Sequence, residues 1–142
     1  MSADRSSVHD HLVELLKQRI LLLDGAAGTT IFAMGLDEEA IRGERFQDHD
    51  RDLKNFVDLI ALTHPDRLVE MHCQFLEAGS DIIETNTFGS SPVGLEDFGL
   101  VHLVEEINTR AVECAREAAD RYTSLTPEKP RFVAGSIGPT TQ

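Results

Sequence analysis

The stretch Ile20–Thr30, whose sequence is ILLLDGAAGTT, carries the clearest signal for the fold. Four apolar residues at 20–23 run directly into an aspartate and a turn of small residues. A short apolar run bounded by glycine is typical of a strand buried on both faces, as parallel strands are in α/β proteins. The turn Gly25–Gly28 has no bulky side chain, so its backbone amides can approach an anionic ligand if a helix begins there. The alternative is an ordinary strand-to-helix turn that uses glycine only for its geometry.

Two more short apolar runs follow, at 80–84 and 131–135, and polar or small residues come directly after each. Segments with helical spacing separate the three runs. Residues 63–79 have a proline in the first turn and a final glycine, and residues 100–122 form a longer amphipathic pattern. This alternation predicts parallel strands joined by right-handed crossovers. Because the carboxyl ends of parallel strands meet at one edge, we expect the polar residues that follow them to lie close together.

Two other regions carry weaker patterns. A serine at position 6 or 7 can cap a helix whose apolar face is made of Val8, Leu12, Leu15 and Leu16. The chain is therefore divided into an N-terminal helical extension at 1–19 and an α/β domain at 20–142, with a short helix expected at 29–34. Residues 36–55 have no clean period and many charges. They are expected to form either a functional loop or a solvated loop held by its own ion pairs.

The composition limits the classes of function. With 142 residues, 41% of them hydrophobic, the chain can form one packed core. A net charge of −12 repels phosphate groups, so neither nucleic acid nor an anionic membrane is an expected partner. Cys73 and Cys114 lie far apart on apolar helix faces, which favours core residues over a disulfide framework or a zinc site. Reduced thiols, with no apolar leader and no long apolar run, predict a cytoplasmic protein.

Four motifs, in order along the chain, resemble a known family. They are LDGAAGT at 23–29, RGERF at 42–46, EAGSDIIETNTF at 77–88 and TPEKPRFVAGSIGPT at 126–140. Together they resemble the N-terminal, homocysteine-binding domain of cobalamin-dependent methionine synthases, within the homocysteine S-methyltransferase family. The RGERF and EKPRF segments favour this group over the related betaine-homocysteine methyltransferases.

The resemblance implies a TIM-type (β/α)8 barrel that binds homocysteine and serves methionine biosynthesis. In that family three cysteine thiolates hold a zinc ion, which activates the substrate thiol for methyl transfer from methylcobalamin. Matched motif to motif, Asp24 and the amides of Gly25 and Ala26 would hold the amino-acid end of homocysteine. Glu84 and Thr85 would face the same pocket. Acidic side chains there suit the ammonium group, and backbone amides suit the carboxylate.

The sequence also departs from the family. A barrel of this type typically has about 250 residues and eight strands, whereas the sequence predicts three strands. The expected fold is therefore α/β: the first three β/α units of a truncated (β/α)8 barrel with an N-terminal helix. The zinc cysteines of the family lie on later strands, and neither Cys73 nor Cys114 matches that setting. No catalytic residue, metal or cofactor is assigned to this segment, and zinc and cobalamin are implied only for the complete enzyme.

The edges of the predicted sheet suggest its partners. Three parallel strands leave both edges free, and free edges promote association. We expect the chain to be inactive alone, and to self-associate or pair with the remaining part of a barrel. One alternative is a non-catalytic interaction module, or a split-enzyme subunit, that uses these edges. Another is a small phosphate-binding α/β protein, which is disfavoured because no lysine follows the second glycine of the turn.

Overall fold

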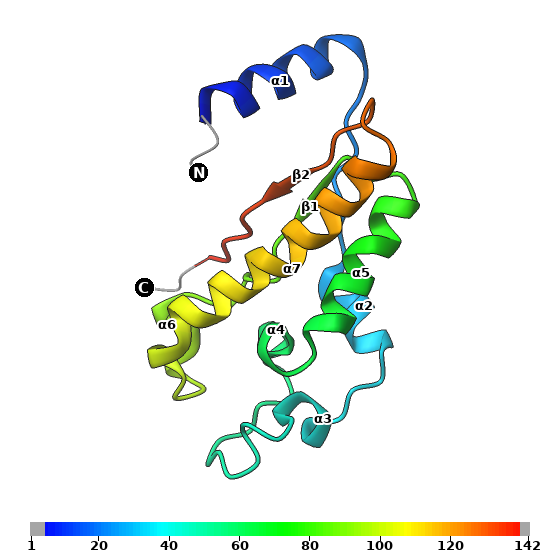
Figure 1. Ribbon diagram of the computed structural model, residues 1–142. Helices are drawn as coiled ribbons and strands as arrows, with labels where there is room; N and C mark the ends of the chain where they lie inside the picture. The colour runs from blue at the N-terminus through cyan, green and yellow to red at the C-terminus, as the bar shows by residue number, and fades with distance from the viewer. Residues whose placement is uncertain (1–4, 140–142) are drawn as a thin grey trace.

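The computed structural model describes residues 5–139 (Figure 1). Its helices and strands, in chain order, are α1 (Arg5–Gln18), α2 (Ala27–Ala33), α3 (Glu38–Arg42), η1 (Val57–Leu59), α4 (Ile60–Thr63), α5 (Pro65–Glu77), β1 (Ile82–Glu84), α6 (Pro92–Glu96), η2 (Val101–Leu103), α7 (Val104–Leu125) and β2 (Phe132–Ala134). The labels η1 and η2 mark short 3-10 helices. The mixture of helices with a parallel sheet is the predicted α/β class.

The sheet is built around β1. β1 and β2 pair in parallel, with Ile83 opposite Val133 at the centre of the register, as expected for strands joined by a helical crossover. On the other side of β1, the extended segment before α2 joins through a single parallel bridge between Leu23 and Ile82. The amide of Asp24 extends this contact by donating to the carbonyl of Ile82 over 2.9 Å.

The prediction of a complete first strand, buried on both faces, is wrong. Segment 20–23 makes only one bridge, and the side chains of Ile20 and Leu22 are 82% and 54% exposed. A run of apolar residues favours an extended backbone. Burial of its side chains also requires other elements to pack against them, and residues 5–139 leave Ile20 and Leu22 largely uncovered. Residues 5–139 thus contain two strands and one bridged segment, and this part of the chain does not show the three β/α units of a barrel.

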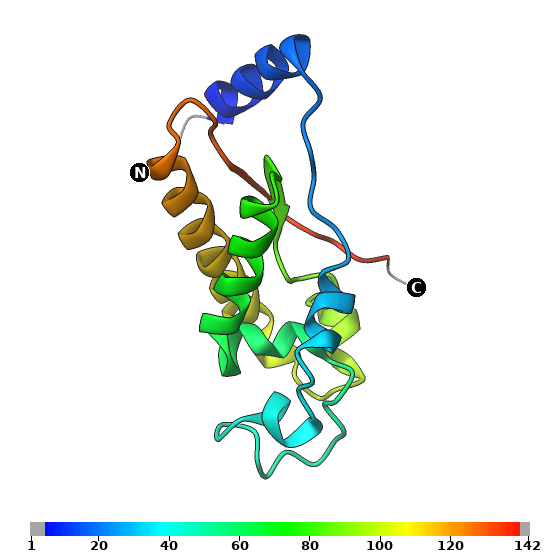
Figure 2. The ribbon, with the colours of Figure 1, turned by 90° about the vertical axis from the view of Figure 1, so that its right-hand side faces the viewer.

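Helices α5 and α7 lie side by side against the strands (Figures 1 and 2). Ile83 of β1 is fully buried in a cluster with Leu76 of α5 and Ala115 of α7. The small side chains on this face of α7 let the helix approach the sheet closely. Helix α5 begins at Pro65, and Gly79 follows its end with a φ of 116°, so both predicted helix boundaries are confirmed.

Helix α7 is the longest element, with 22 residues. Its regular α-helical part begins at Val104, because residues 101–103 form a 3-10 turn, and it ends at Leu125 beyond the predicted limit of residue 122. One face is buried and the other carries charged side chains in pairs such as Arg110 with Glu113. Within residues 5–139 no helix, α7 included, has the length and apolarity needed to cross a bilayer.

The segment 36–55 adds to the hydrophobic core. The Asp37 carboxylate accepts a hydrogen bond from the amide of Ala40 over 2.8 Å and caps α3, a helix that was not predicted. Phe46 and Leu53 are buried in one cluster with apolar residues of α6 and α7. The predicted solvated loop held by its own ion pairs therefore describes segment 36–55 only in part, because the segment also contributes buried side chains to the core.

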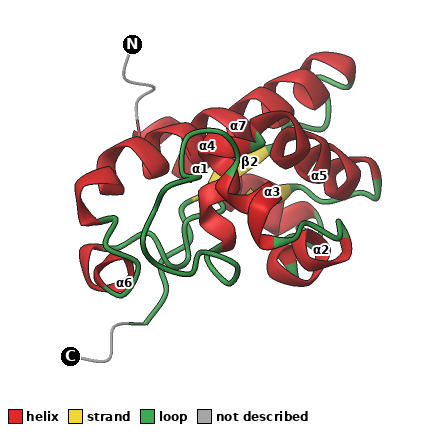
Figure 3. Cartoon of the chain, turned by 90° about the horizontal axis from the view of Figure 1, so that it is seen from below, coloured by secondary structure: helices red, strands yellow, loops and turns green. Residues whose placement is uncertain are grey.

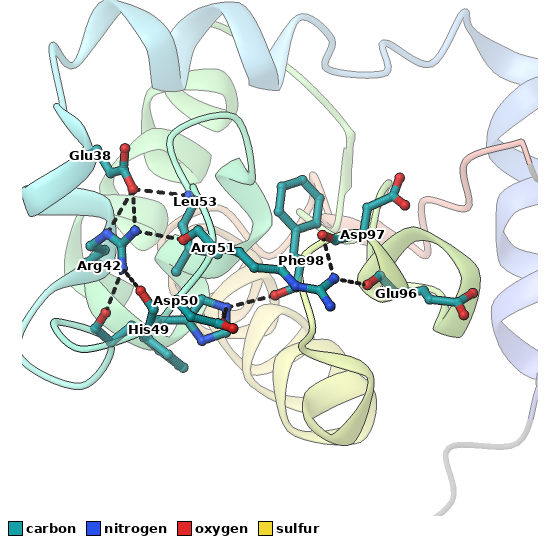
Figure 4. A network of polar contacts seen from close by, with 10 residues as sticks. Glu38, Arg42, His49, Asp50, Arg51, Leu53, Glu96, Asp97 and Phe98 are labelled. Atoms are coloured by element: carbon teal, nitrogen blue, oxygen red, sulfur yellow. Dashed lines mark hydrogen bonds and ion pairs between the residues drawn. The ribbon is translucent and has the colours of Figure 1, made fainter.

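Arg42 nevertheless forms the polar centre of this segment (Figure 4). Its guanidinium pairs with Glu38, one turn earlier in α3. It also donates to the carbonyls of Phe46, His49 and Arg51 over 3.1, 2.7 and 2.7 Å. The planar guanidinium carries several N–H donors and can bind several carbonyls at once. The Arg42 side chain therefore holds the loop backbone in place in addition to forming an ion pair with Glu38.

Helix α1 stands apart from α5, at the amino ends of the strands (Figures 1 and 2). Its apolar residues are largely exposed, Leu16 by 60%. Arg19, directly after the helix, donates two hydrogen bonds of 2.8 Å to the buried carboxylate of Asp81. The ring of His11 meets Phe132 edge-on, with 5.7 Å between centroids. The predicted N-terminal helix is present, while the domain division at residue 20 stays a prediction.

Candidate functional site

The acidic residues of the predicted site lie at the carboxyl ends of neighbouring segments. The Oδ1 atom of Asp24 accepts a hydrogen bond from the amide of Glu84 over 3.0 Å, although the two residues are 60 positions apart. Seen from below, α6 and α2 lie on either side of the strands (Figure 3). The structure thus brings Asp24 and Glu84 together at one edge of the sheet. Their roles in binding stay a prediction.

Thr85 has a structural task at this edge. Its amide donates to the carbonyl of Ala134 over 2.9 Å, and its hydroxyl accepts from the amide of Ser136 over 3.1 Å. The same hydroxyl lies 2.7 Å from that of Thr87, which donates to the carbonyl of Ser136 over 2.8 Å. The side chain of Thr85 therefore ties the ends of β1 and β2 together, which leaves it little capacity to bind a ligand.

Gly25 and Ala26 form the exposed turn between the bridged segment and α2. Ala26 adopts a left-handed conformation with a φ of 54°, which is uncommon for a residue with a side chain. Within the described chain, the amides of both residues have no hydrogen-bond acceptor. Binding of an anionic group by these amides stays a prediction.

A cavity of about 380 Å³ opens at the same edge. Its lining comes from the start of α2, from η1 and from the loops after β1, α6 and β2: Ala27, Gly28, Asn55, Phe56, Val57, Asp58, Glu84, Thr85, Asn86, Phe88, Gly89, Phe98 and Ser136. Of the five predicted residues, Glu84 and Thr85 line the cavity. Asp24, Gly25 and Ala26 do not, although Asp24 contacts the backbone of Glu84. The volume is within the range of small-molecule sites.

One wall of the cavity is aromatic and was missed in the sequence. The rings of Phe56 and Phe98 stack with 4.7 Å between centroids. A polar clamp holds this wall from outside (Figure 4): His49 Nε2 donates to the carbonyl of Phe98 over 2.8 Å. Arg51 donates to the carbonyls of Glu96 and Asp97 over 2.7 and 2.8 Å. A local sequence pattern cannot predict these contacts, because they join segments more than 40 residues apart in sequence.

Two carboxyl groups at this edge have perturbed pKa values. Burial raises the pKa of Asp24 to about 6, against the opposing effect of the hydrogen bond from Glu84. Burial also raises the pKa of Asp58, although Ser90 and Gly89 donate hydrogen bonds to it. Such shifts are frequent where carboxylates line a functional cleft, and of these two groups Asp58 lines the cavity.

The two cysteines do not fit a zinc site. Cys114 is buried in the core between α4, α5 and α7, and Cys73 packs at the edge of a second core cluster, as predicted. Burial raises the pKa of both thiols, which disfavours the thiolate that zinc requires. Among residues 5–139 no three histidine, cysteine or acidic side chains are grouped so as to hold a metal ion.

Comparison with known proteins decides the family. Residues 21–142 match the family described as homocysteine S-methyltransferase. The chain belongs to this family. Two structures of the homocysteine methyltransferase MmuM from Escherichia coli are similar to it, an oxidized form with 28% identity and a metallated form with 26% identity, each with a TM-score of 0.67. They match 88% and 89% of this chain but only 39% and 40% of their own, so the chain spans about two fifths of these homocysteine S-methyltransferases.

Proposed function

We propose that this chain is the homocysteine-binding portion of a methionine synthase, the enzyme that transfers a methyl group from 5-methyltetrahydrofolate to the homocysteine thiol. Membership of the homocysteine S-methyltransferase family supports the substrate class. The RGERF and EKPRF motifs support the cobalamin-dependent branch. The observation that carries the proposal is the contact between Asp24 and Glu84 beside a cavity at the carboxyl edge of the sheet.

The side chains at this edge suit an amino acid with an apolar tail. The Oδ2 atom of Asp24, which has no hydrogen-bond partner within residues 5–139, and the carboxylate of Glu84 would attract the ammonium group, and the amides of Gly25 and Ala26 would donate hydrogen bonds to the carboxylate of the ligand. The aromatic wall of Phe56 would face the carbon chain and sulfur, since sulfur packs favourably against aromatic rings. Zinc and cobalamin belong to this proposal only for the complete enzyme, in the cytoplasm, and no residue here is assigned to either.

Isothermal titration calorimetry with L-homocysteine tests the proposal. We expect the chain to bind homocysteine, and we expect Asp24→Asn and Glu84→Gln each to weaken binding by about tenfold, the loss of one charge-assisted hydrogen bond. A matched control is Asp48→Asn, which removes the same charge from an exposed position with no contact to the cavity. Equal affinity in all four proteins, or no binding by the wild type, would contradict the proposal.

The affinity should depend on pH through Asp24. Because the pKa of this carboxyl is raised to about 6, it carries its charge above that pH and loses it below. The ammonium group of the ligand stays charged throughout this range, so affinity should fall by about tenfold between about pH 7 and about pH 5. Calorimetry across this range checks the trend. Glu84→Gln should keep the pH dependence and Asp24→Asn should flatten it, and an unchanged profile in Asp24→Asn would refute the assignment.

A second candidate is association through exposed apolar surface, with a complementary barrel fragment or a second copy. It is favoured by the exposure of Ile20, Leu22 and Ile137, by 82%, 54% and 86%. We expect light scattering to show a species larger than a monomer, and we expect Ile20→Lys with Leu22→Lys to shift it toward monomer. Leu125→Lys, at an exposed residue on the end of α7, is the control. A wild-type monomer that melts cooperatively would count against this candidate.

A further inference from the structure

Asp58 is a buried acid whose two carboxylate oxygens have different surroundings. It lies in η1 with only 4% of its surface exposed. Its Oδ2 atom accepts two hydrogen bonds from the loop after β1, from the amide of Gly89 over 2.8 Å and from the hydroxyl of Ser90 over 2.7 Å. These two bonds fix the plane of the carboxylate and therefore the direction of its other oxygen.

The other oxygen, Oδ1, takes part in neither of these hydrogen bonds. Within residues 5–139 it has no hydrogen-bond partner, and it is not among the side-chain atoms sealed off from solvent. Asp58 is one of the residues that line the cavity, as are Glu84 and Phe56. A buried carboxylate with one fixed and one unused oxygen thus borders a cavity of about 380 Å³.

No cation of the described chain balances this charge. None of the ion pairs among residues 5–139 involves Asp58, and the described cavity lining contains no lysine, arginine or histidine. Burying a carboxylate without a cation is costly, and such groups are usually paired or bind a ligand. Burial accordingly raises the pKa of Asp58. A ligand that brings a positive charge into the cavity would satisfy the unused oxygen and relieve this cost.

We propose that Asp58 is a ligand-binding residue, whose Oδ1 accepts a hydrogen bond from the ammonium group of the amino-acid ligand. The inference rests on the proposed function and adds to it an acid that lies outside the sequence motifs. Phe56 and Phe88 line the same space, so the carbon chain of the ligand would lie against aromatic side chains while its ammonium group meets the carboxylate. Ser90 and Gly89 hold Asp58 in place through their hydrogen bonds to Oδ2.

The test pairs a variant with a change in the ligand. Calorimetry compares L-homocysteine with 4-mercaptobutanoate, which lacks only the amino group, on the wild type and on Asp58→Asn. We expect Asp58→Asn to weaken homocysteine binding by about tenfold and to leave 4-mercaptobutanoate within about twofold. Asp48→Asn controls for net charge. Ser90→Ala removes one hydrogen bond to Oδ2 and should keep the preference for homocysteine, because it leaves the carboxylate in place.

The outcomes separate this inference from the function on which it rests. If the wild type binds homocysteine and Asp58→Asn binds it equally well, the inference is wrong and the proposed function stands. If the wild type does not bind homocysteine, the proposed function fails, and a second measurement decides the inference. NMR of the Asp58 side-chain carboxyl carbon during titration with L-2-aminobutyrate, an amino acid without the thiol, should show a shift of that resonance. A resonance that does not move would overturn the inference as well.

Discussion

Replacing Asp81 with alanine is expected to lower the free energy of unfolding by about 3 kcal/mol, the cost of losing about three hydrogen bonds to one buried carboxylate at about 1 kcal/mol each. The Asp81 side chain is 1% exposed. It accepts two hydrogen bonds of 2.8 Å from Arg19 and one of 2.9 Å from the amide of Leu22, and Lys129 lies 3.7 Å away. This one carboxylate therefore joins α1, the bridged segment and the approach to β2.

Urea denaturation of wild type, Asp81→Ala and the exposed control Asp48→Ala measures this effect. The pKa of Asp81 gives a second signature. Burial acts to raise it, but the hydrogen bonds from Arg19 and Leu22 and the charge of Lys129 outweigh burial and hold it below the ordinary 3.8. The contribution of Asp81 should thus be present above about pH 4 and should disappear as the pH falls further. A loss in Asp81→Ala no larger than in the control would show that the pair is not structural.

Acid should destabilise the wild type through His72. This side chain on α5 is fully buried, and neither ring nitrogen has a hydrogen-bond partner in the described chain. Burial lowers the pKa of His72 from 6.5 to about 4. Between these two pH values His72 is therefore protonated in the unfolded chain and neutral in the folded chain. Stability should therefore fall as the pH drops below about 6.5, and the loss should reach about 3 kcal/mol near pH 4.

The variant His72→Leu isolates this effect from the titration of the carboxylates. Leucine leaves no unpaired polar atom in the core, so the variant should be more stable than the wild type by about 1 kcal/mol at neutral pH. The difference should widen toward pH 4 by the amount given above. Chemical denaturation at several pH values checks both numbers. If the difference in unfolding free energy between wild type and His72→Leu stays constant from neutral pH to pH 4, His72 is hydrated or paired in solution.

The sequence predicts the elements whose signals are local. Pro65 and Gly79 mark the ends of α5, and the carboxyl ends of parallel strands bring Asp24 beside Glu84. The exposure of Ile20 could not be predicted in this way, because an apolar run specifies a strand but does not supply the layer that covers it. Helix α3 was missed although Asp37 is a capping residue, since its five residues are too few to show a period.

The cavity depends on contacts that are distant in sequence. Phe56 and Phe98 meet because Arg51 and His49 bind the chain at the end of α6, and these contacts follow from the packing of the whole segment. Asp58 lies in a short apolar piece and becomes a candidate only when its hydrogen bonds to the loop after β1 are known. The sequence motifs thus predict which residues lie at the carboxyl edge of the sheet. Most of the residues that line the cavity there are brought together only by the tertiary structure.

The most direct test of the account is the map of backbone amide shifts in NMR during titration with L-homocysteine. The account predicts that the shifts gather at the turn of Gly25 and Ala26, at Glu84 and along residues 56–58 and 86–89, and that Asp24→Asn weakens them together. Shifts confined to the opposite end of the strands, around Val8 and Phe132, would place the ligand elsewhere and contradict the central claim that one amino-acid pocket forms at the carboxyl edge.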